Sequence, residues 1–237
     1  MRFLGERLRT AGHTVSGIRL AGHGTRPENL ERCGWQDWYQ SVEAGFEALS
    51  ARCSKLVAVG LSIGSLLALR LACEHPDDVS AVVLLSPALV LRNPWPARLA
   101  SLLGLLSLLL PSGMAYWPKG DSDIADPEAR KRHPAYKRLP LQAVAEFVRL
   151  QREVRPLLSE VHQPVLAIQG RQDHTVTLDN LAILQRELPN LRGTVILPAS
   201  YHVVTVDLEK DRVAEEIIRF IDQVVGGRRT RARGGRL

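Results

Sequence analysis

The segment that constrains the fold most joins a buried strand directly to a helix through the turn Gly-Leu-Ser-Ile-Gly. Residues 55–60, KLVAVG, form a continuous apolar, β-branched run with the length of a buried strand. The pattern SLLALRLACEH follows the turn and predicts a helix that Pro76 ends. Similar apolar runs occupy residues 81–86, 164–170 and 193–198. Strands that are apolar on both faces need helices on both sides, so we predict an α/β fold with a mostly parallel sheet.

The remaining pattern predicts one domain with an insertion. Apolar residues at helical spacing predict helices at residues 2–11, 35–50 and 210–225, and a short strand is expected at 13–19. The stretch between the strands at 81–86 and 164–170 is far too long for an ordinary crossover and shows helical but no strand periodicity. We therefore expect a core at residues 1–87 and 160–225, a helical cap at 88–159 and a basic, disordered tail at 226–237.

Composition indicates an ordinary globular protein. Of the 237 residues, 45% are hydrophobic and 24% charged, and a chain of this length needs no metal or disulfide to fold. The three cysteines are an odd number without CxxC spacing, which fits a reducing compartment. No apolar stretch of signal-peptide length begins the chain, so we expect a cytoplasmic protein.

The formal charge of +6 is concentrated at one end of the chain. Five arginines lie among the last ten residues: Arg228, Arg229, Arg231, Arg233 and Arg236. The rest of the chain is nearly neutral. A solvated terminus is favoured over a segment that binds RNA or anionic lipid, and we expect no nucleic-acid partner.

Residues 60–64 match the pattern G-x-S-x-G between a strand and a helix, which is typical of a nucleophile elbow. Such a turn holds Ser62 in a strained backbone conformation, so its neighbours must lack bulk, and Gly60 and Gly64 meet this need. The Ile63 N–H at the helix N-terminus is expected to donate to a developing oxyanion. The alternative is a turn of small residues without chemistry, which the strand and helix flanks disfavour.

A serine nucleophile needs a histidine base and a carboxylate, which follow it in this class in the order Ser, Asp or Glu, His. Of the seven histidines, His202 is the candidate because it follows the last strand and every candidate carboxylate at a strand end. His174 is disfavoured because it directly follows Asp173. Asp173, three residues past the strand at 164–170, is the matching acid, whereas Asp179 and Asp207 are better explained as helix caps.

These motifs resemble the α/β-hydrolase superfamily, in particular its compact carboxylesterase and monoacylglycerol lipase group. The resemblance covers residues 1–225 in the order LAGHGTRPENL, the tryptophans near Trp38, GLSIG, GRQDHTV and YHVVTVDLEKD. It implies that Ser62 is the nucleophile, Asp173 the acid and His202 the base. Tyr201 stands where the family usually has glycine, and it is expected to narrow the site.

The family pattern opens with strands that have no counterpart here, the third of which ends in a His-Gly turn that supplies an oxyanion N–H. The strands at 13–19 and 55–60 should therefore be separated by a gap with unpaired backbone groups. We favour a truncated or misassigned start. The alternative is that the two strands pair directly and another group serves the oxyanion.

The cap contains the leucine-rich run RLASLLGLLSLLLP, which is too short to cross a bilayer. Two interpretations stay open. In the first, the run is a buried cap helix. In the second, it contacts lipid, either by lining an acyl pocket, with Leu103 and Leu106 as candidates, or by entering a membrane surface.

The resemblance implies a serine hydrolase of carboxylic esters, with short- to medium-chain acyl esters or monoacylglycerols as substrates and no cofactor. The alternative from another class is a noncatalytic binding module of the same fold that lacks the oxyanion strand. The sequence leaves the oligomeric state and the acyl length open.

Overall fold

The computed structural model describes residues 1–95, 99, 102, 104–105 and 115–226. Its main sheet has four parallel strands in the order β1-β2-β5-β6. These strands are β1 (Leu56–Leu61), β2 (Val79–Leu85), β5 (Val165–Gly170) and β6 (Leu191–Leu197). All four are apolar runs that the sequence predicted to be strands, so the predicted α/β class with a parallel sheet is confirmed.

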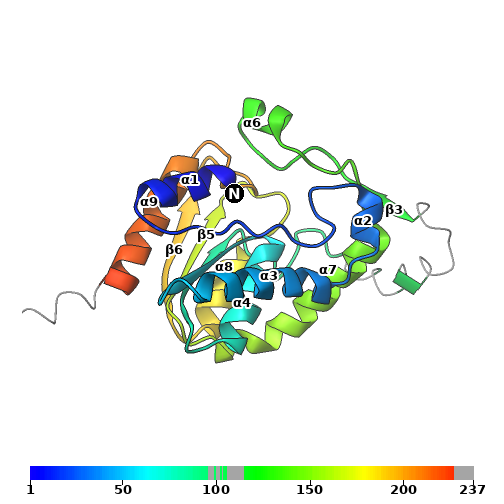
Figure 1. The fold of residues 1–237 in the computed structure, drawn as a ribbon. Coiled ribbons are helices and arrows are strands. Elements are labelled where there is room, and N and C mark those ends of the chain that lie inside the picture. Colours follow the sequence, from blue (N-terminus) through cyan, green and yellow to red (C-terminus); the bar gives the residue numbers. More distant parts are fainter. Residues whose placement is uncertain (96–98, 100–101, 103, 106–114, 227–237) are drawn as a thin grey trace, which may run out of the picture.

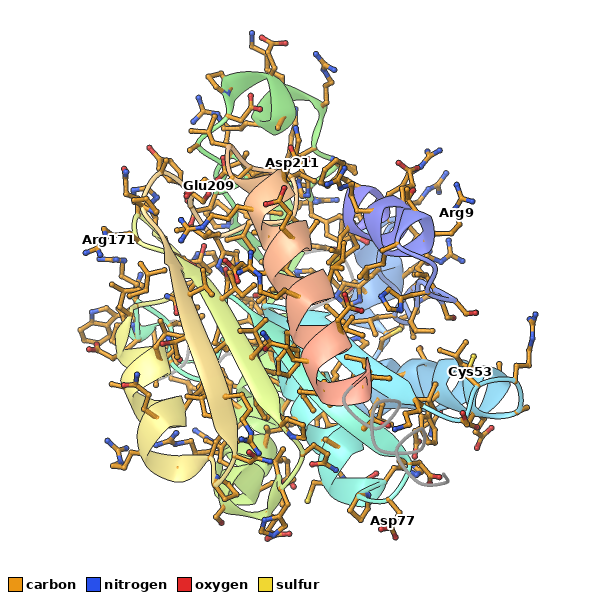
Figure 2. The ribbon with its side chains drawn as sticks, turned by 90° about the vertical axis from the view of Figure 1, so that its left-hand side faces the viewer. Arg9, Cys53, Asp77, Arg171, Glu209 and Asp211 are labelled. Carbon is orange, nitrogen blue, oxygen red and sulfur yellow. The ribbon has the colours of Figure 1, made fainter. Side chains whose placement is uncertain are left out.

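Helices cover both faces of this sheet (Figure 1). One face carries α1 (Arg2–Thr10) and α9 (Lys210–Ile221), and Figure 2 shows α9 lying across the strands with α1 beside it. The other face carries α3 (Trp35–Ser50), α4 (Ile63–Glu74), α7 (Leu141–Val154) and α8 (Asp179–Glu187). A 3₁₀ helix, η1 (Arg155–Glu160), follows α7, and a π-helical turn, η2 (Asp222–Gly226), ends α9.

The two apolar layers explain why the central strand β2 lacks a polar face. Ala81, Val83 and Leu85 of β2 pack in the layer with α1 and α9, whereas Val82 and Leu84 pack on the opposite side with α4. Successive side chains of a strand point to opposite faces, so both sets must be apolar when both faces are covered.

The predicted strand at residues 13–19 is wrong. The chain there is extended without regular secondary structure, and Val15 and Ile18 are about two-fifths exposed. A cavity of about 930 Å³ lies between residues 13–20 and β1, so the two segments do not form a ladder. Strand structure depends on a hydrogen-bonded partner, which apolar alternation alone cannot supply. β1 is consequently an edge of the described sheet.

The sequence predicted a helical cap, but the cap also contains strands. Two short strands, β3 (Tyr116–Pro118) and β4 (Arg138–Pro140), form an antiparallel pair, and α6 (Pro127–Arg132) lies between them in the sequence. The helix α2 (Pro27–Glu31) lies beside β4. Ladders of three residues are too short to show strand periodicity in a sequence. We call residues 115–140 the cap segment. The predicted domain boundaries stay a prediction.

The leucine-rich run is described only in part. Leu103 and Leu106, the predicted acyl-pocket residues, lie outside the described residues, as does the tail at 227–237. Leu99, Leu102 and Leu105 are 36%, 56% and 61% exposed, which does not agree with a fully buried helix. Within the described ranges, the helices include none with the length and apolarity needed to span a bilayer.

Candidate active site

Ser62 occupies a sharp turn between β1 and α4. Its backbone has φ 55° and ψ −115°, a left-handed φ that a residue with a side chain rarely adopts. A Cβ at Gly60 would lie 2.0 Å from the carbonyl oxygen of Gly64, so only glycine fits at position 60. At Gly64 itself a Cβ would meet nothing within 4 Å, so the predicted steric need for glycine does not hold there.

Hydrogen bonds to the neighbouring strand hold this turn in place. The Ser62 N–H donates to the Leu85 carbonyl at 2.8 Å. The buried hydroxyl of Ser65 lies 2.9 Å from the Gly60 carbonyl and 3.1 Å from that of Leu85. The strained backbone is therefore fixed by α4 and β2 together.

Asp173 and His202 form a buried pair. The Asp173 Oδ2 lies 2.9 Å from His202 Nδ1, and the two residues are 1% and 8% exposed. The other carboxylate oxygen accepts the N–H groups of Thr175 and Val176, each at 2.8 Å. A carboxylate fixed in this way accepts the proton of Nδ1, which leaves His202 Nε2 as a proton acceptor.

These residues meet because they follow parallel strands. Ser62 follows β1, Asp173 follows β5 and His202 follows β6, and the carboxyl ends of parallel strands lie at one edge of a sheet. Ser62 and His202 line the same cavity of about 740 Å³. Among the described residues, no hydrogen bond joins the Ser62 hydroxyl to His202, and such bonds are often long without substrate.

A neighbouring residue that the sequence analysis missed positions the base. Ser86, which follows β2, has φ 43° and donates its hydroxyl to the His202 carbonyl at 2.7 Å. A Cβ at Gly170 would lie 2.2 Å from the Tyr201 carbonyl, so the ends of β5 and β6 approach closely. Neither contact leaves a sequence signal, because each joins residues distant along the chain.

Two further carboxylates hold the loop before His202. Glu209, labelled at the end of α9 in Figure 2, accepts the Ala199 N–H at 2.9 Å and the Ser200 hydroxyl at 2.8 Å. Asp207 is fully buried and accepts the Tyr201 N–H at 2.8 Å. It also accepts N–H groups of the cap segment, from Ala125 at 3.0 Å and Asp126 at 2.9 Å. Asp207 thus joins the loop before His202, here called the base loop, to the cap segment. The sequence had suggested only that Asp207 caps the N-terminus of a helix.

Replacing Asp207 with alanine is expected to lower the free energy of unfolding by about 3 kcal/mol, because buried N–H groups would lose their acceptor. Urea denaturation measures this loss. The control is Asp211→Ala, an exposed carboxylate in the first turn of α9, which should cost no more than about 0.5 kcal/mol. Equal losses in the two variants would contradict the role of Asp207.

Three other histidines line the cavity although the sequence analysis set them aside. His23 packs edge-on against Trp38 with ring centroids 5.5 Å apart, and His133 Nδ1 lies 2.9 Å from the Ser122 hydroxyl. His174 pairs with Asp123 at 2.8 Å and not with Asp173, as expected for adjacent residues. Asp123 was missed because it lies about 50 residues earlier in the chain.

The cavity lining contains both apolar and polar residues. The apolar ones include Leu30, Trp38, Leu139, Ala143 and Phe147, and the polar ones come largely from the cap segment. Tyr201 also lines the cavity and packs edge-on against His174 at 4.5 Å, in keeping with the expected narrowing. Such a site accommodates a molecule with an apolar part and a polar part.

The strand order, the sharp turn at Ser62 and the acid–histidine pair beyond it define an α/β-hydrolase. The chain belongs to the family described as serine aminopeptidase, S33, whose model matches residues 2–209. The superfamily inferred from the motifs is thereby confirmed.

Similar proteins agree with this assignment. A thermostable monoacylglycerol lipase from Bacillus sp. (strain H-257) is 31% identical over 95% of this chain and 86% of the relative. The carboxylesterase of Bacillus subtilis (strain 168) is 24% identical over 94% of this chain and 87% of the relative. A solved chain from work on LipS and LipT, two metagenome-derived lipolytic enzymes, matches with a TM-score of 0.84 and 31% identity, covering 94% of this chain and 87% of that chain. The chain is thus a hydrolase of the esterase and lipase group.

Proposed function

We propose that this chain hydrolyses carboxylic esters through an acyl-enzyme on Ser62. The single observation that carries the proposal is the buried Asp173–His202 pair at the same sheet edge as the strained Ser62 turn. The monoacylglycerol lipase and carboxylesterase relatives support esters as the substrate class.

In this mechanism each residue has one role. His202 Nε2 takes the proton of the Ser62 hydroxyl, which attacks the ester carbonyl. Asp173 keeps the imidazole in the required tautomer and stabilises its charged form. The alcohol leaves with the proton from His202, and water, activated by the same histidine, then releases the acid.

The Ile63 N–H is the proposed oxyanion donor. Ile63 is the first residue of α4, where the N–H groups of a helix lack acceptors within the helix. Loss of one oxyanion donor typically costs about 10²- to 10³-fold in rate. We assign no residue as a second oxyanion donor, and we therefore expect a modest turnover number for ester hydrolysis.

The proposed substrates are short- to medium-chain acyl esters or monoacylglycerols. The apolar cavity wall, with Leu139 and Phe147, supports binding of an acyl chain. The exposed side chains of Leu99, Leu102 and Leu105 support contact with further apolar surface, such as a long acyl chain or a lipid layer. Leu103 and Leu106 stay candidates for the acyl pocket on their sequence alone.

A fluorophosphonate probe tests this proposal. Such a reagent reacts with an activated serine, fluoride leaves, and a covalent phosphonyl serine remains. We expect peptide mass mapping to place the label on Ser62, and 4-nitrophenyl butyrate to slow labelling by competing for the site. Labelling that is absent in folded protein, or that maps to another serine, would contradict the proposed nucleophile.

A further inference from the structure

A lysine of the cap segment faces the cavity that contains Ser62. Lys119 follows β3 directly, and its N–H donates to the Lys137 carbonyl at 3.0 Å, which anchors its backbone to the opposite side of the β3–β4 hairpin. Its side chain lines the cavity together with Ser62 and His202. The backbone position of Lys119 is therefore set by the fold.

Lys119 is exposed as a residue, and its ammonium group is only partly shielded from water and has no acidic partner among the described residues. Burial lowers its pKa, and no ion pair or side-chain hydrogen bond joins it to another of the residues that the structure describes. Burial likewise lowers the pKa of His23 and of His133, and the charge of Lys119 lowers both further. The cation thus acts on two histidines that line the cavity.

Neither carboxylate in the cavity lining pairs directly with this cation. Asp123, on the same wall, is already engaged by the His174 ring and by the Thr175 hydroxyl at 2.9 Å. Asp121 lines the cavity, but within the described ranges no hydrogen bond or ion pair joins it to Lys119. Arg130 supplies a second cation to this wall, and no acidic side chain among the described residues pairs with it.

Other cations of the cap segment differ from these two. Lys131 and Arg132 pair with Glu128, and Arg138 pairs with Glu28 at 3.0 Å. Lys119 and Arg130 are exposed as well, but neither has such a partner among the described residues. A cation in a cavity, where less water surrounds it, gains from an anionic partner because the interaction strengthens as the local dielectric falls.

We propose that Lys119, with Arg130 on the same cavity wall, binds a carboxylate carried by the ester substrate. The inference rests on the proposed ester hydrolysis and narrows its substrate class to esters with one anionic group. The carboxylate docks on the cap segment while the ester carbonyl lies at Ser62. The apolar residues of the cavity lining contact the hydrocarbon part of the same molecule.

Two matched ester pairs test this proposal. The first compares the 4-nitrophenyl half-ester of glutaric acid with its neutral methyl-capped counterpart, which places the charge on the acyl side. The second compares 4-carboxyphenyl butyrate with 4-carbamoylphenyl butyrate, which places it on the alcohol side. The readout is the ratio of kcat/KM for the anionic ester to that for the neutral ester, with the Ser62→Ala rate subtracted as background.

We expect Lys119→Met to lower this ratio about tenfold in at least one pair, the size of one charge-assisted hydrogen bond. Lys119→Arg should keep most of the ratio. The control is Lys137→Met, an exposed lysine in the same hairpin that does not line the cavity, and it should keep the wild-type ratio. An unchanged ratio in Lys119→Met for both pairs would overturn the inference.

Direct binding separates this inference from the proposed function. If the folded wild-type chain hydrolyses no ester, ester hydrolysis fails and titration calorimetry with glutarate then decides the role of Lys119. Binding that weakens about tenfold in Lys119→Met but not in Lys137→Met supports the carboxylate site. Binding that is absent, or equal in both variants, overturns it.

Discussion

Replacing Ser62 with alanine is expected to lower kcat for 4-nitrophenyl butyrate by about 10⁶-fold, the loss typical of removing the serine of a catalytic triad. The hydroxyl is the only group of the proposed mechanism that forms a bond to the acyl carbon, so nothing replaces it. The measurement is nitrophenolate release under saturating substrate, with circular dichroism to verify folding. Because Ser62 already adopts a positive φ, alanine adds no new backbone strain.

The control for this variant is Ser54→Ala, an exposed serine before β1, which should hydrolyse the ester at the wild-type rate. Ester hydrolysis that persists in a folded Ser62→Ala protein would contradict the acyl-enzyme mechanism. It would direct attention to another nucleophile on the cavity wall.

Asp173→Asn should reduce kcat by about 10⁴-fold while leaving the fold intact. An amide at this position donates to His202 Nδ1, which forces the proton onto Nε2, so the imidazole can no longer accept the serine proton. The backbone N–H groups of Thr175 and Val176 still find the amide oxygen, so the local structure keeps its hydrogen bonds. Steady-state kinetics and thermal melting of the same preparation measure the two properties.

The matched control is Asp123→Asn, which alters the second Asp–His pair of the cavity. His174 in that pair is 63% exposed in its side chain, against 10% for His202, so water can replace the lost interaction. We expect less than about a tenfold change in kcat there. Similar losses in Asp123→Asn and Asp173→Asn would contradict the assignment of Asp173 as the acid.

Much of the candidate site could be predicted because strand order and motif position carry information. Ser62 follows from a strand–turn–helix pattern, and the order of acid and base after it selects Asp173 and His202. The structure brings these residues to one edge of the sheet, as parallel strands require. Their catalytic roles stay predictions until the variants above are measured.

The supporting residues could not be predicted in the same way. Asp207 looks like a helix cap in the sequence, but the fold surrounds it with N–H groups from the cap segment and the base loop. Lys119 is one basic residue among several in a charged stretch, and only its place in the cavity distinguishes it. The strand expected at 13–19 failed for a related reason, since strand structure requires a neighbouring ladder.

The sequence by itself determined the α/β class, the four parallel strands and the position of the sharp turn at Ser62. These features depend on local periodicity and on glycine geometry, both of which neighbouring residues encode. Only the tertiary structure decided that β1 is an edge of the sheet and which carboxylates hold the base loop. It also decided which lysine of the cap faces the cavity. Hydrogen bonding, desolvation and charge pairing between residues distant along the chain depend on three-dimensional proximity, which no local pattern specifies.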